Sequence, residues 1–149
     1  MKSIFNKEEY NSIMARIDKL TPQNQRLWGK MDVAQMLAHC VEPIRAALGE
    51  ITLKKNLIVM LFKGAIKKAI TTEKQFTKNS PTAREYIVTD SRNFEKEKEK
   101  LKSYITKFHN VGAAAFDNKE HPIVGKLTSD EWGLSVYKHL DYHLGQFGA

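Results

Sequence analysis

The sequence predicts an all-α protein, and more specifically a four-helix bundle with long crossover connections between some of its helices. Three segments begin with side chains that cap helix N-termini, and apolar residues recur at helical spacing through four long segments. No run alternates between apolar and polar residues as a half-buried strand does. A chain of 149 residues has the length of one domain, which we expect to span residues 1–149.

Each of the three helix starts approximates a capping box. The cap residues are Asn6, Asp32 and Thr128, and each is followed three residues later by Glu or Gln. In such a box the two side chains accept hydrogen bonds from backbone N–H groups that have no partner within the helix. Apolar residues also flank each cap at the spacing of a hydrophobic staple, as the pairs Phe5/Tyr10, Met31/Met36 and Leu127/Trp132.

The elements follow from these starts and from the apolar spacing. Long helices are expected over residues 7–20, 33–48, 92–109 and 129–145, and the stretch 53–70 predicts one extra basic amphipathic helix. Residues 77–91 and 110–126 are expected to be connections without regular structure. Pro43 lies inside the second helix, where it either kinks the turn that contains His39 or ends the helix early.

The positive charge of the chain is local. The net charge is +7, and residues 51–80 hold seven lysines against a single acid, Glu73. Such a segment fits an anionic lipid surface, nucleic acid or a partner subunit. We do not expect nucleic-acid binding, because no helix-turn-helix or other reading motif is present. The apolar side of the segment fits a homodimer contact better.

The chain has the features of a cytoplasmic protein. Its single cysteine, Cys40, excludes an intramolecular disulfide, and the first 20 residues do not read as a signal peptide. The longest apolar run, LIVMLF, is far shorter than the roughly 18 residues of a transmembrane segment. Helical rotation places Cys40 in the apolar arc of its helix, so we expect a core residue and not a nucleophile.

Three histidines are placed to share a metal ion. His139 and His143 lie one helical turn apart, separated by a rotation of only ~40°, at the edge of the apolar stripe of the last helix. His39 occupies the matching edge of the second helix. If these helices are neighbours, three imidazoles meet at one place, as in bundles whose metal sites combine side chains from facing helices. The other reading is that all three are polar residues at the border of the core.

The sequence also resembles a known group of proteins. The stretches WGKMDVAQMLAHC, NSPTAREY, HPIVGKLTSDEW and YKHLDYHLGQF together resemble a bacterial family of unknown function in the DinB-like superfamily. The resemblance implies a DinB-like four-helix bundle and a divalent metal, commonly zinc or nickel, held by His39, His139 and His143. The sequence departs from the family pattern at Tyr142, where a further histidine often stands.

Two reactions are compatible with such a site. Three imidazoles suit Zn²⁺ or Ni²⁺ and leave a coordination position open, as in catalytic zinc sites. The ion would activate either a water molecule, for a hydrolase, or a small-molecule thiol, for a transferase of low-molecular-weight thiols. The resemblance favours the thiol, because some relatives transfer such thiols. The alternative is a non-catalytic helical bundle that acts as a binding or interaction module through segment 51–80.

Other polar residues are candidates for contact with the ligands or with a substrate. Three roles are open for Glu42: a general base, a group that supports a metal ligand, or a solvated acid on the surface. Gln146 and Tyr142 lie close to the last ligand, His143. We expect His109 to interact with the C-terminal dipole of its helix. His121 is expected in a surface loop, unless it overhangs the site.

Overall fold

A computed structural model describes all residues, 1–149, and shows a mainly helical chain. The elements in order are α1 (Lys7–Lys19), α2 (Val33–Ala47), α3 (Leu57–Leu61), α4 (Lys63–Thr71), the 3-10 helix η1 (Arg84–Tyr86), α5 (Phe94–Val111), the 3-10 helix η2 (Ala113–Phe116), the strands β1 (Lys119–His121) and β2 (Gly125–Leu127), and α6 (Ser129–Gln146). The prediction of a helical protein is confirmed. None of the helices combines the length and the apolar composition that a membrane span requires.

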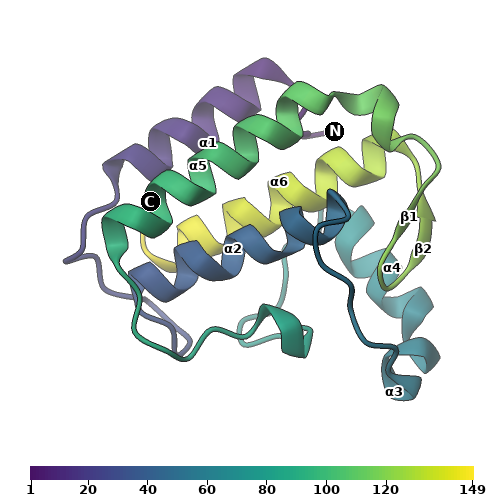
Figure 1. Cartoon of the computed structure of the whole chain (residues 1–149), viewed down its shortest axis with the longest axis horizontal. Coiled ribbons are helices and arrows are strands. Elements are labelled where there is room, and N and C mark those ends of the chain that lie inside the picture. The colour runs from purple at the N-terminus through teal and green to yellow at the C-terminus, as the bar shows by residue number, and fades with distance from the viewer.

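The four long helices α1, α2, α5 and α6 pack side by side (Figure 1). Helix α1 contacts both α5 and α6, and helix α2 contacts the same two helices. Helices α2 and α5 run in the same direction, and the chain between them crosses over through α3, α4 and η1 (Figure 1). One consequence matters for function: α2 and α6, which carry the three histidines, are neighbours.

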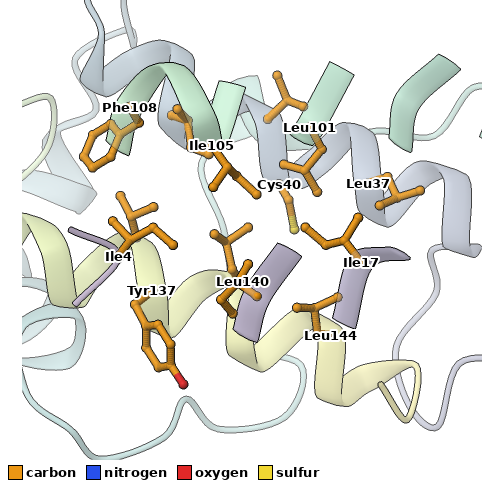
Figure 2. Close-up of a cluster of buried hydrophobic side chains, with 14 of the residues drawn as sticks. Ile4, Ile17, Leu37, Cys40, Leu101, Ile105, Phe108, Tyr137, Leu140 and Leu144 are labelled. Atoms are coloured by element: carbon orange, nitrogen blue, oxygen red, sulfur yellow. The ribbon is translucent and has the colours of Figure 1, made fainter. Parts of the chain in front are cut away.

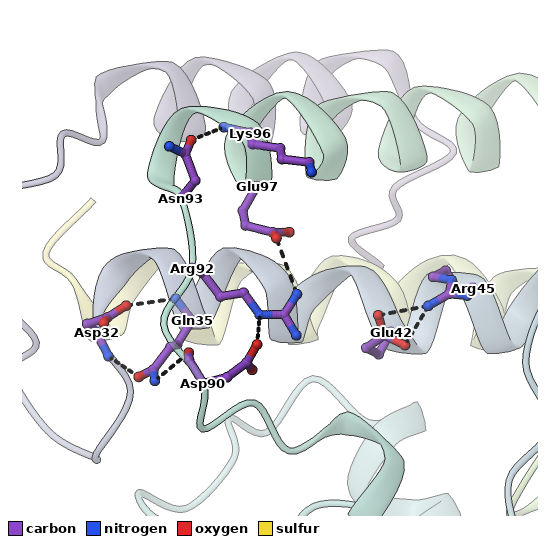
Figure 3. A network of polar contacts seen from close by, with 9 residues as sticks. All are labelled: Asp32, Gln35, Glu42, Arg45, Asp90, Arg92, Asn93, Lys96 and Glu97. Atoms are coloured by element: carbon purple, nitrogen blue, oxygen red, sulfur yellow. Dashed lines mark hydrogen bonds and ion pairs between the residues drawn. The ribbon is translucent and has the colours of Figure 1, made fainter.

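The predicted caps set the helix starts. Asp32 accepts a hydrogen bond from the backbone N–H of Gln35 at 2.8 Å, and the side chain of Gln35 accepts from the N–H of Asp32 at 3.0 Å (Figure 3). Thr128 and Glu131 form the same reciprocal pair at α6. Asn6 caps α1 through the N–H of Glu8 alone. These bonds satisfy N–H groups that the helices themselves leave without partners.

Buried side chains from all four long helices form one core (Figure 2). Cys40 lies inside it with only 1% of its surface exposed, and burial raises the pKa of its thiol. The prediction that Cys40 is a core residue is therefore confirmed. Helix α2 continues past Pro43 to Ala47, as the predicted range 33–48 requires, so the alternative of an early helix end at this proline is excluded.

The prediction of one basic amphipathic helix over residues 53–70 is wrong, because the segment forms two short helices that meet at Phe62. Helix α4 packs Ile66 and Ile70 against the core, whereas α3 buries none of its residues. The ammonium group of Lys138, on α6, donates to the carbonyl oxygens of Ala69 and Thr72 and so holds the C-terminal end of α4. Since both halves share one apolar spacing, the spacing alone does not reveal the break.

Residues 110–126, expected to be irregular, include a small antiparallel hairpin. Lys119 pairs with Leu127, and His121 pairs with Gly125. Each strand has only three residues, too few to show an alternating pattern. His121 belongs to this hairpin: its Nδ1 accepts from the N–H of Ile123 at 3.1 Å, and burial lowers its pKa to about 4.

Candidate metal centre

The structure brings the three predicted histidines together. The Nε2 atom of His39 lies 3.2 Å from the Nε2 of His139 and 3.1 Å from the Nε2 of His143. The three side chains form a group that could hold one metal ion, with ligand atoms all within 4.8 Å of one another. His39 comes from α2 and the other two from consecutive turns of α6.

The hydrogen bond on the far side of its ring fixes the tautomer of His39. Its Nδ1 lies 2.7 Å from the carbonyl oxygen of Tyr86, at the end of η1. A carbonyl oxygen only accepts hydrogen bonds, so this Nδ1 must carry the proton. In the neutral ring the Nε2 of His39 is then unprotonated and directs a lone pair towards the other two histidines.

His143 is fixed in the same way by a side chain. Its Nδ1 lies 2.9 Å from Oε1 of Gln146. The amide of Gln146 is itself oriented, because its Nε2 donates to the carbonyl oxygen of Trp28 at 2.7 Å. The oxygen of the amide therefore faces His143, and the Nδ1 of His143 donates to it. The Nε2 of His143 is left unprotonated, like that of His39.

Two lone pairs consequently face each other across 3.1 Å. This arrangement is repulsive unless a cation or a proton lies between the rings. The remaining ring, His139, makes no hydrogen bond through Nδ1 within the chain, so its tautomer is free to adapt. It either donates a proton to His39 or directs a third lone pair to the same point.

Burial keeps the three rings neutral. Desolvation lowers the pKa of His39, although the Tyr86 carbonyl and the charge of Glu42 oppose this. Desolvation, followed by repulsion from the other two rings, lowers the pKa of His139 well below its usual value, and the pKa of His143 falls to about 4. At neutral pH all three rings are therefore in the neutral form, which leaves one nitrogen of each free to bind a metal.

The dimensions suit a small divalent ion. Zinc–imidazole bonds of 2.0–2.1 Å in tetrahedral geometry place ligand nitrogens about 3.3 Å apart. The two Nε2 separations from His39, 3.1 and 3.2 Å, are close to that value. An all-imidazole donor set suits zinc, nickel and other borderline metals.

Aromatic side chains border the group. The ring of Tyr142 meets His143 edge-on at 5.1 Å. Its hydroxyl accepts from the indole N–H of Trp28 at 3.1 Å and donates to the carbonyl of Thr77 at 3.3 Å. The ring of Phe76 also packs edge-on against Tyr142, with the ring centroids 5.6 Å apart. Tyr142 thus joins α6 to the two connections that contain Trp28 and Thr77.

The other candidates have different surroundings. Both carboxylate oxygens of Glu42 lie 3.1 Å from Arg45, and no hydrogen bond joins Glu42 to a histidine (Figure 3). The Nδ1 of His109 lies 2.9 Å from the carbonyl of Ile4, and its ring stacks on Tyr10. Neither residue belongs to the three-histidine group.

Two contributors to the site were not found in the sequence, namely the backbone carbonyl groups of Tyr86 and Trp28. No side-chain pattern encodes a carbonyl acceptor, so the residue types gave no signal. The structure also shows why a glycine stands next to Trp28: Gly29 has a φ of +85°, and a Cβ atom there would lie too close to Nε2 of Gln146.

Replacing Gly29 by alanine is expected to disturb the site through Gln146. Gly49→Ala is the matched control, since Gly49 has a φ of +78° but open space around it. Both variants should lose about 1–2 kcal/mol to left-handed strain. Only Gly29→Ala should also bind Zn²⁺ about 10–100-fold more weakly, because Gln146 no longer orients His143. Urea unfolding and zinc titration measure the two effects, and equal zinc affinities in both variants would contradict the role of Gln146.

Comparison with known proteins gives a family but no activity. The searches of curated proteins and of solved structures returned no match. A family model described as a protein of unknown function, DUF1569, matches residues 3–149. The match covers almost the whole chain, including the three histidines and both connections that border them. The chain therefore belongs to the DUF1569 family of proteins of unknown function.

Proposed function

We propose that this protein binds one divalent metal ion, zinc or nickel, through His39, His139 and His143, and that it is a DinB-like metalloprotein. One observation carries the proposal. The outer nitrogens of His39 and His143 donate to fixed acceptors, so their inner nitrogens direct lone pairs at each other. A bound cation converts this repulsion into coordination.

The alternative of three polar border residues fits the surroundings less well. His39 and His143 are 3% and 8% exposed, so they do not lie on a solvated edge. A structural histidine would use both ring nitrogens in ordinary hydrogen bonds to other groups. Here the inner nitrogens have no hydrogen-bond partner except one another. Three imidazole rings are desolvated together at one point, which ordinary packing of the core does not require.

The helix arrangement supports the DinB-like assignment. Four long helices pack together, a long connection joins the parallel pair α2 and α5, and the histidines lie on facing helices (Figure 1). Metal sites in helical bundles are often built in this way.

For the reaction, we propose activation of a low-molecular-weight thiol. Three protein ligands leave a position open, and a divalent ion there lowers the pKa of a bound thiol or water. Hydrolysis by bound water usually employs a nearby carboxylate as the base, but the metal-binding group contains histidines alone, and Glu42 is held by Arg45. A thiol needs no such base, since its proton passes to solvent as the thiolate binds. Tyr142, Trp28 and Phe76 would form an apolar wall beside it.

The metal content of the purified protein tests the site directly. The parent should contain about one zinc or nickel ion per chain, and alanine variants of His39, His139 and His143 should each lose most of it. His109→Ala is the matched control, because it removes a partly buried histidine outside the group, and it should retain the metal. Elemental analysis after extensive dialysis gives the answer. Full occupancy in all three site variants would refute the proposal.

Thiol binding is tested with the Co²⁺-loaded protein. Addition of a small thiol should produce a near-ultraviolet charge-transfer band, because a thiolate joins the open position. The same thiol added to Co²⁺-treated His139→Ala should give no such band. A parent that binds cobalt and yet shows no change with several small thiols would leave the metal site intact but contradict the thiol assignment.

A further inference from the structure

Helix α3 exposes apolar side chains that the rest of the fold does not cover. Its residues and the adjoining Phe62 form a patch that we call the α3 tip, and its exposed members are Leu57, Ile58, Met60, Leu61 and Phe62. Their exposed fractions lie between 56% and 82%, and α3 buries no residue at all. Figure 1 shows α3 projecting from the side of the molecule, beyond α4 and away from α1 and α5. Such a concentration of exposed apolar surface marks an interaction site.

The α3 tip is flanked by positive charge alone. Five lysines and no acidic residue occur between Glu50 and Glu73. Lys54 and Lys55 precede the tip and Lys63 follows it, and these three side chains form no ion pair. Glu85 reaches the segment, but it accepts from the backbone N–H of Lys54 and leaves the ammonium group free. The partner that fits this surface is negatively charged and has an apolar interior.

We propose that the α3 tip docks the protein on the surface of an anionic lipid bilayer, with its apolar side chains among the acyl chains and the flanking lysines at the headgroups. The five residues of α3 are too few to span a bilayer, so the segment inserts only into the interface. The inference is independent of the proposed metal site, which lies between α2 and α6.

The distribution of the apolar residues favours lipid over a protein partner. The four exposed positions of α3 spread over ~160° of the helix, and Phe62 extends the patch further. A helix packed against a protein surface usually has polar residues on its opposite face, whereas acyl chains can surround a projecting tip on all sides. A two-fold contact between two α3 tips would also bring the flanking lysines of both chains into one interface that has no acidic residue among them.

Flotation of the full chain with lipid vesicles tests the proposal. The parent should float with phosphatidylcholine vesicles that contain phosphatidylserine, and at least tenfold less with phosphatidylcholine alone. The double variant Leu57→Ser/Leu61→Ser should lose at least tenfold of the binding. Leu27→Ser/Val111→Ser is its control, since it removes two other exposed apolar side chains.

The contribution of the lysines to vesicle binding is tested with two double variants that have the same net charge. Lys54→Gln/Lys55→Gln should weaken binding to the anionic vesicles, whereas Lys30→Gln/Lys96→Gln, with the same net charge, should not. A dye attached through Leu61→Cys reports insertion, because Cys40 is buried and does not compete for the label. Its emission should shift to the blue with anionic vesicles, and that of a Leu27→Cys conjugate should not.

Several results would overturn the proposal. They are no flotation of the parent, equal binding to neutral and anionic vesicles, and equal losses in the tip variants and their controls. A parent dimer in solution that becomes a monomer in Leu57→Ser/Leu61→Ser, without vesicle binding, would instead identify a second copy as the occupant. Metal content plays no part in these measurements, so failure here leaves the metal proposal standing.

Discussion

The hydrogen bonds on the outer nitrogens of His39 and His143 decide what the centre of this protein can do. The Tyr86 carbonyl and the oriented amide of Gln146 both require a donor, so each ring must hold its proton on the outside. The inner nitrogens are then bare, close together and shielded from water. Without these two acceptors the same three rings could form ordinary hydrogen bonds to one another, and no two lone pairs would be forced to face each other.

The rest of the fold places those acceptors. Helices α2 and α6 bring the rings together, but the acceptors lie on the two long connections. Tyr86 belongs to residues 72–93, between α4 and α5, and Trp28 belongs to residues 20–32, between α1 and α2. The second connection also fixes the C-terminus, since the N–H of Leu27 donates to the carbonyl of Gln146 at 2.8 Å. Arg16 adds a bond of 2.9 Å to the carbonyl of Ala149. The last residues of the chain are therefore tied to the site, unlike the frayed ends of most domains.

The features that could be predicted from the sequence are those that depend on residues close together in the chain. Capping and helical spacing are local, so the starts of α2 and α6 and the shared edge positions of the three histidines were predictable from residue types. The break between α3 and α4 at Phe62 was not predictable from residue types. Lys138 and the core hold α4, whereas α3 remains uncovered, and these contacts come from distant parts of the chain. The β1–β2 hairpin is too short to leave a pattern. The two carbonyl acceptors could not be predicted from residue types at all. Every residue has the same backbone carbonyl group, and only the path of the folded chain places those of Tyr86 and Trp28 at the site.

The protonation of the ring nitrogens tests this account most directly. Long-range proton–nitrogen NMR spectra of the metal-free protein at neutral pH distinguish the two tautomers of each histidine. The account predicts that His39 and His143 both carry the proton on Nδ1, and that zinc shifts the Nε2 signals of all three histidines while those Nδ1 protons remain. A proton on Nε2 of either His39 or His143 in the metal-free protein, or Nε2 signals that zinc leaves unchanged, would contradict it.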